Sequence, residues 1–172
     1  MQFELTDAVS VLERTPQTFT SLLAGLSPNW LTNSEGAGTW NAKEIVAHLI
    51  HMDRANWLRR ATLLITKDIM VSFDPLNREG GLDIADQTVE ELLDLFQSTR
   101  TSVLSELAQL QITHAQYGKS AVHPDFGVVK LSQLLSAWVV HDLNHLSQAS
   151  RVLAKQYREE VGPWIEYLRI LK

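Results

Sequence analysis

The sequence contains no cysteine in its 172 residues. It therefore has no disulfide framework, no thiolate metal site and no cysteine nucleophile. It also lacks any run of about 18 uninterrupted apolar residues, so no membrane-spanning helix is expected. The formal net charge is −5 and the basic residues are scattered, which argues against a nucleic-acid surface. The N-terminus has no basic segment followed by an apolar run, so we expect no signal peptide. These absences favour a soluble, cytoplasmic protein without nucleic-acid or membrane partners.

Apolar residues recur at helical spacing in four long segments. The predicted helices cover residues 4–26 (kinked or restarted at Pro16), 42–66, 88–110 and 131–157, and a short helical segment follows from 161 to 171. No strand-like alternation of useful length appears, and no change in composition marks a second domain. The chain is therefore predicted to be all-α, a four-helix bundle in one domain spanning residues 1–172.

The segment 131–157 carries the most unusual pattern. At about 100° per residue, His145 falls inside its apolar stripe, His141 at the edge and Asp142 near the middle. Burying three ionisable groups costs free energy unless something pairs with them. The spacing of four residues places both imidazoles on one face, where a single metal ion can bridge them. His48 borders the apolar stripe of the 42–66 helix and is a candidate third partner.

Two interpretations of these residues remain open at this point. In the first, His48, His141 and His145 bind a metal from facing helices, and Asp142 holds a ring N–H or a bound water. Neutral imidazoles suit Zn, Ni, Cu and Fe, and three protein ligands leave a coordination position for water or substrate. In the second, the histidines are core residues hydrogen-bonded to Asp142, to a backbone carbonyl or to Trp138.

Arg100 projects into the apolar stripe of the 88–110 helix, which is unusual for arginine. It could anchor an anionic ligand group such as a carboxylate. The alternatives are a structural ion pair with Asp142 or another acid, or a side chain whose charged end reaches solvent. Gln148 lies at the edge of the helix face that carries the histidines. It is a candidate to contact one of the metal-binding histidines; the alternative is that it is an ordinary residue of the helix surface.

Two long connections, 67–86 and 113–129, interrupt the helical pattern. Loops of this length are often functional, and we expect these two to close a pocket. The second connection contains His114 and His123, which we expect to be solvated surface residues.

Three stretches resemble the DinB-like superfamily: TWNAKEIVAHL around His48, HPDFG at 123–127, and WVVHDLNHLSQASRV around His141 and His145. The resemblance extends from Leu12 to the closing VGPWIEYL. It implies an up-down-down-up bundle with a divalent metal held by three histidines. The family's ligands map onto His48, His141 and His145, so none is missing.

What the resemblance implies about activity is less specific. Characterised relatives include S-transferases that use bacillithiol or mycothiol, and a mycothiol-dependent maleylpyruvate isomerase, and members are often homodimers. Our first hypothesis is a metal-dependent transferase or hydrolase, with Zn or Ni activating a low-molecular-weight thiol or water toward a small electrophilic substrate. The alternatives are a non-catalytic, stress-associated bundle that binds a metal or ligand, and a structural bundle with satisfied core histidines. A homodimer is expected from the resemblance alone.

Overall fold

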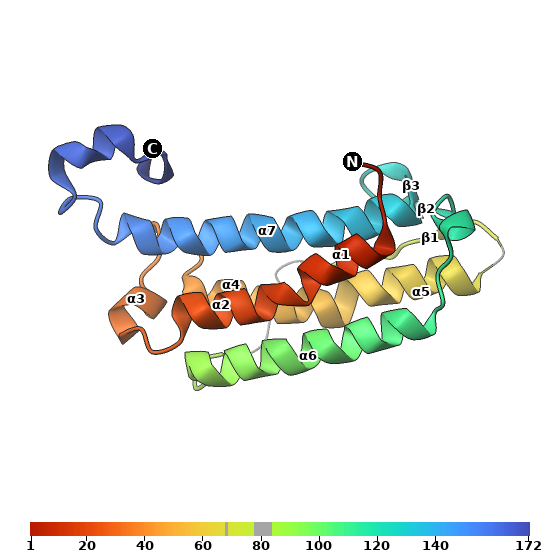
Figure 1. The fold of residues 1–172 in the computed structure, drawn as a ribbon, viewed down its shortest axis with the longest axis horizontal. Coiled ribbons are helices and arrows are strands. Elements are labelled where there is room, and N and C mark those ends of the chain that lie inside the picture. The colour runs from red at the N-terminus through yellow and green to blue at the C-terminus, as the bar shows by residue number, and fades with distance from the viewer. Residues whose placement is uncertain (68, 78–83) are drawn as a thin grey trace.

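The structure is a computed structural model, and it describes residues 1–67, 69–77 and 84–172. Long helical stretches lie side by side in a bundle (Figure 1). They are α1 (Leu5–Leu12) with α2 (Arg14–Leu23), α4 (Ala42–Met52) with the π-helical turn η1 (Asp53–Trp57) and α5 (Leu58–Thr66), α6 (Val89–Gln109), and α7 (Leu131–Lys155). The first and fourth stretches run in one direction and the second and third in the other (Figure 1). The predicted four-helix, up-down-down-up bundle is therefore confirmed. Within the described ranges, no helix is long and apolar enough to cross a membrane.

The predicted helix ends agree with the structure because their caps are encoded locally. The Asn41 side chain accepts a hydrogen bond from the Glu44 N–H at 3.0 Å, and the Glu44 carboxylate accepts one from the Asn41 N–H at 2.7 Å. Thr88 and Glu91 form the same capping box at the start of α6. A short 3₁₀ segment, η3 (Gly162–Tyr167) with η4 (Arg169–Leu171), closes the chain as predicted.

A small three-stranded sheet lies in the connections, where no strand was predicted. Its strands are β1 (Val71–Ser72), β2 (Ser120–His123) and β3 (Gly127–Lys130), in the order β1-β2-β3. β1 pairs parallel with β2, and β2 pairs antiparallel with β3. Strands of two to four residues are too short for the alternation that identifies a strand in a sequence. The remaining short elements are α3 (Pro28–Thr32) and η2 (His114–Gln116).

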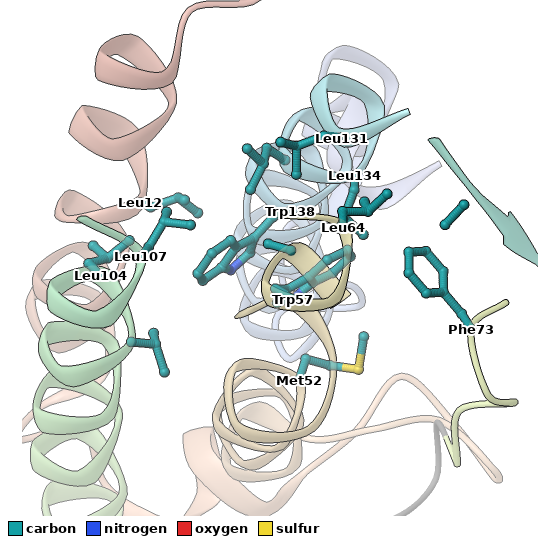
Figure 2. Close-up of a cluster of buried hydrophobic side chains, with 14 residues drawn as sticks. Leu12, Met52, Trp57, Leu64, Phe73, Leu104, Leu107, Leu131, Leu134 and Trp138 are labelled. Atoms are coloured by element: carbon teal, nitrogen blue, oxygen red, sulfur yellow. The ribbon is translucent and has the colours of Figure 1, made fainter. Parts of the chain in front are cut away.

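The apolar core consists of two clusters stacked along the bundle. One contains Leu12, Leu107, Leu131 and Trp138, and the other contains Phe19, Ile45 and Phe96 among its buried residues. Figure 2 shows Leu12, Leu107 and Trp138 of the first cluster directed toward one another from separate elements. The indoles of Trp57 and Trp138 stack with centroids 6.2 Å apart, so this cluster joins α7 to the second helical stretch.

Charged residues lie between the two clusters, in the middle of the bundle. Arg100, only 1% exposed, donates from Nε to Asp53 at 2.8 Å and from Nη1 to Asp142 at 2.6 Å. Trp138 Nε1 donates to Asp53 at 3.1 Å. Burial raises the pKa of Asp53 to about 6. Burial opposes ionisation of Asp142 as well, but the neighbouring His141 imidazole and the Arg100 guanidinium hold its pKa below the ordinary value. Arg100 is thus in the ion-pair arrangement with Asp142 and a second acid, Asp53.

The same guanidinium explains where the first helical stretch breaks. The sequence places the kink at Pro16, whereas α1 ends at Leu12 and α2 begins at Arg14. Pro16 has no N–H to donate to the carbonyl four residues earlier, which is that of Leu12. Arg100 Nη1 donates to this carbonyl instead, at 2.8 Å. The effect of the proline is thus seen one turn before it, and its freed acceptor is satisfied from α6.

Arg100→Met should lower the free energy of unfolding at pH 7 by about 3–5 kcal/mol, because two buried carboxylates lose their partner. Without the guanidinium, the folded-state pKa of Asp53, which burial already raises to about 6, rises further, and the folded-state pKa of Asp142 rises above its unfolded value. The variant should therefore lose stability as the pH rises from 5 to 7. Urea denaturation at both pH values measures this.

Arg54→Met is the matched control for that experiment, because Arg54 is exposed and, among the described residues, its side chain makes only a 3.5 Å hydrogen bond to Thr99. It should change the unfolding free energy by less than about 0.5 kcal/mol. Equal stability of the Arg100 variant and the wild type would show that the central charges are not coupled as described.

Candidate metal centre

Three imidazoles from two helices converge at one point. His48 lies on α4, and His141 and His145 lie one turn apart on α7. His141 Nε2 is 3.1 Å from His48 Nε2 and 3.2 Å from His145 Nε2, and the candidate ligand atoms all lie within 4.8 Å of one another. Ligands about 2.0–2.1 Å from a tetrahedral zinc ion lie about 3.3 Å from one another. The separations involving His141 are close to this value.

Indole rings fix the orientation of these imidazoles. Trp40, just before the α4 capping box, lies 4.6 Å from the His48 ring and stacks on His145 at 6.0 Å, measured between centroids. Trp57 meets His141 edge-on at 5.2 Å. The imidazoles are therefore packed against rigid aromatic surfaces on two sides, which limits the rotamers available to them.

His145 is held in the form that binds a metal. Its Nδ1 lies 2.7 Å from Gln148 Oε1. An amide oxygen only accepts, so this bond assigns the proton to Nδ1 and leaves a lone pair on Nε2, which faces the other rings. The residue is 6% exposed, and burial, reinforced by the neighbouring His141, lowers its pKa to about 4. The imidazole is thus neutral at pH 7. Gln148 makes the contact that its position on the histidine face suggested.

His141 connects this cluster to the charged centre of the bundle. Its Nδ1 is buried, has no hydrogen-bond partner in the described part of the chain, and lies 4.0 Å from Asp142 Oδ1. Asp142 therefore lies beside the candidate ligand, but its carboxylate is bound mainly by Arg100. Arg100 itself points at two acids of the chain and does not line the cavity described next.

A cavity of about 1020 Å³ reaches His48 and His141. Both long connections contribute to its wall, as predicted: Phe73 and residues 75–77 from the first, and His123–Phe126 with Val128 and Val129 from the second. Residues 68 and 78–83 of the first connection lie outside the described residues. The cavity gives a small molecule access to the face of the bundle where the histidines meet.

Two features of this cavity were not predicted from the sequence. His123, expected at the surface, is half-buried in the wall and stacks on Phe126 at 4.5 Å, because the hairpin turn folds the two rings together. The turn residues in HPDFG are the signal that could have indicated this. His114 is exposed, as predicted.

The π-helical turn η1 is the second missed feature, and it has no signature in the sequence. Its residues Asp53, Asn56 and Trp57 are all buried. Asn56 Oδ1 and Trp57 Nε1 have no hydrogen-bond partner among the described residues. Such widened turns are frequent at functional sites, since they bring extra side chains to one helix face.

Together, the bundle and the histidine cluster define a helical protein with a candidate metal centre between its second and fourth helical stretches. The family model of the DinB superfamily matches residues 11–149, so the chain belongs to the DinB superfamily. It is similar in structure to YfiT from Bacillus subtilis, described as a probable metal-dependent hydrolase with an unusual four-helix bundle topology. That match has 19% identity and a TM-score of 0.75, and covers 90% of each chain.

A second similar structure is TT2238, described as a four-helix bundle protein. It shares 22% identity, with a TM-score of 0.56, over 84% of this chain and 97% of that one. No curated protein matches the chain. At these identities, the likeness to the two solved structures shows the fold alone.

The tautomer assigned to His145 can be tested in metal-free protein by long-range ¹H–¹⁵N NMR. We expect a proton on Nδ1, none on Nε2, and no further protonation between pH 7 and 5, because the pKa is lowered to about 4. Gln148→Leu, which removes the acceptor, should abolish the preference for Nδ1–H. An imidazole that titrates near its ordinary value in the wild type would contradict the assignment.

Proposed function

We propose that this protein is a divalent-metal-dependent enzyme that hydrolyses a small electrophilic substrate. His48, His141 and His145 would bind Zn or Ni through their Nε2 atoms. The observation that carries the proposal is the convergence of these nitrogens, 3.1 and 3.2 Å apart, beside a cavity of about 1020 Å³. The description of YfiT as a probable metal-dependent hydrolase supports the same reaction class.

The residues present fit a metal. With its proton on Nδ1, His145 directs a lone pair at His141 Nε2, and His48 Nε2 lies 3.1 Å from that same nitrogen. The protons on the rings cannot satisfy three imidazole nitrogens that face one another, whereas a cation can bind all three of them at once. Nitrogen donors without any thiolate favour Zn or Ni over softer ions. When bound, the metal would supply Lewis acidity and lower the pKa of a water or thiol.

The chain's own residues would orient the ligands and exclude bulk water. Gln148 holds the His145 ring by Nδ1, as outer partners of metal-binding histidines usually do. The Asp142 carboxylate lies 4.0 Å from His141 Nδ1 and can accept a hydrogen bond from a ring N–H there after a small movement of the ring. Trp40 and Trp57 cover the rings, which keeps the local dielectric low and strengthens electrostatic interactions with a substrate.

Thiol-dependent transfer is a second candidate, favoured by the size of the cavity. At about 1020 Å³ it is slightly above the range for pockets that hold one drug-sized ligand, about 300–1,000 Å³. A low-molecular-weight thiol and an electrophile could be bound together. The resemblance to thiol-dependent S-transferases supports this alternative, and it supports assembly as a homodimer.

The metal content of untagged, purified protein tests the proposed centre. We expect about one equivalent of Zn or Ni in the wild type, as one three-histidine site binds one ion. His145→Ala should lose the metal, whereas His114→Ala, which changes an exposed histidine, should retain it.

Hydrolysis of p-nitrophenyl acetate, measured on the same samples, separates an enzyme from a non-catalytic metal-binding bundle. Activity should disappear with a chelator, return with the metal, and be at least about 100-fold lower in His145→Ala. If the protein binds the metal but neither hydrolyses the ester nor transfers a group to an added thiol, it is a metal-binding bundle without catalytic activity. No metal in the wild type, and none taken up on adding Zn or Ni, would exclude the proposed function.

A further inference from the structure

The π-helical turn η1 buries three side chains that can form hydrogen bonds, and only one of them is paired within the chain. Asp53 accepts hydrogen bonds from Arg100 and from the Trp138 indole. Asn56 Oδ1 and Trp57 Nε1, by contrast, have no hydrogen-bond partner among the described residues. Asn56 is 2% exposed and Trp57 is 7% exposed, so bulk water does not take the place of these partners.

Both unpaired side chains line the cavity that reaches the candidate metal centre. The Trp57 ring also meets the His141 ring edge-on, with their centroids 5.2 Å apart, so this part of the wall is next to the candidate metal ligands. Met52, Phe73 and Leu134 belong to the first core cluster and add apolar surface to the same cavity (Figure 2). A ligand in the cavity would therefore lie against both apolar surface and the two unpaired side chains.

Unpaired polar atoms in such a wall need an explanation. A buried donor or acceptor without a partner destabilises a protein, and apolar side chains of similar shape, such as leucine and phenylalanine, would avoid that cost. Native proteins keep few such atoms, and the ones they keep are expected where a ligand supplies the partner. Two of them in consecutive residues of a widened helical turn, a feature frequent at functional sites, favour a ligand-binding role.

The two atoms are of opposite kind, and this defines the ligand group. An indole N–H only donates, and an amide oxygen only accepts. A carboxamide, –CO–NH–, carries an acceptor and a donor on separate atoms of one planar group, whereas an ester or a carboxylate carries acceptors only. We propose that the cavity binds its substrate through a carboxamide group. The carbonyl of this group accepts from Trp57 Nε1, and its N–H donates to Asn56 Oδ1.

This inference names a substrate class for the candidate site. That the carboxamide belongs to a molecule that is hydrolysed rests on the proposed function. Binding of the carboxamide does not, because Asn56 and Trp57 are not ligands of the proposed metal. Both atoms are covered by neighbouring side chains in the structure, so binding requires small side-chain rotations in the wall, which are common when a partner binds.

The indole N–H signal of Trp57 in ¹H–¹⁵N NMR spectra of the metal-free full-length chain reports the first contact directly. The five tryptophans give five indole signals, and the signal that is lost in Trp57→Phe belongs to Trp57. We expect N-methylbenzamide to move this proton signal downfield, and by more than the other four, because the indole gains an acceptor.

Dissociation constants from the same titrations test the second contact. N-methylbenzamide should bind about 3- to 10-fold more tightly than N,N-dimethylbenzamide or methyl benzoate, which have no N–H to donate. Asn56→Leu should weaken N-methylbenzamide by about the same factor and leave N,N-dimethylbenzamide within about twofold of its wild-type affinity. Benzyl alcohol, which offers a donor and an acceptor from one oxygen, should bind less tightly than N-methylbenzamide.

Urea denaturation separates ligand binding from a structural role. Asn56→Leu should unfold at an equal or higher urea concentration than the wild type, because it removes an unpaired acceptor and the cavity can take the extra volume. Gln133→Leu is the matched control. Gln133 is a second amide side chain in the cavity wall, but its Oε1 already accepts from the Lys130 N–H at 2.8 Å. This variant should unfold at a lower urea concentration and keep its affinity for N-methylbenzamide within about twofold.

Four results would overturn the inference. They are a Trp57 indole signal that does not respond to N-methylbenzamide, equal affinity for the two benzamides, a difference between them that persists in Asn56→Leu, and tighter binding of benzyl alcohol. A clear loss of stability in Asn56→Leu would assign Asn56 to the core instead. If Trp57→Phe does not fold, the wild-type ligand series and Asn56→Leu decide the question. Because no metal is present, each of these failures is distinct from a failure to bind Zn or Ni.

Discussion

One guanidinium in the middle of the bundle joins its four helical stretches. Arg100 of α6 binds Asp53 in the second stretch, Asp142 in α7 and the Leu12 carbonyl at the break in the first. Asp142 follows His141 directly, and Asp53 is in the same helical stretch as His48. The ion pairs that fix the axial positions of these helices therefore also fix where the histidines meet. A buried ion pair adds little net stability, but it is well suited to selecting one register among several.

The two buried polar clusters differ in a way that bears on function. Around Arg100, donors and acceptors are matched within the chain: both carboxylates, the freed carbonyl and the Trp138 indole have partners. In the histidine cluster, ring nitrogens face one another, and His141 Nδ1 has no hydrogen bond in the described residues. Buried polar groups are usually satisfied, so an arrangement like this is expected where a ligand completes it. The first cluster is thus structural, and the second is the candidate site.

The bundle could be predicted because long amphipathic segments and the Asn41 and Thr88 capping boxes are local signals. The three histidines could be predicted as well, since a polar pair at helical spacing on an apolar face is conspicuous. The short strands could not, because they depend on pairing between connections far apart in the sequence. The π-helical turn could not either, because it has no signature in the sequence, whereas the turn residues of HPDFG were a signal for the wall position of His123. Arg100 shows the same limit: its position in an apolar stripe was visible and Asp142 was one of the partners considered, but Asp53 and the Leu12 carbonyl became known only from the fold.

The most direct test of the three-histidine centre is X-ray absorption spectroscopy of the zinc-loaded protein. Three imidazole nitrogens at about 2.0–2.1 Å, with the remaining position filled by oxygen or nitrogen, are expected if His48, His141 and His145 all bind through Nε2. His48→Ala should reduce the imidazole contribution to two, which would assign the third nitrogen to α4. A zinc ion surrounded mainly by oxygen, or an unchanged spectrum in His48→Ala, would contradict a centre built from these two helices.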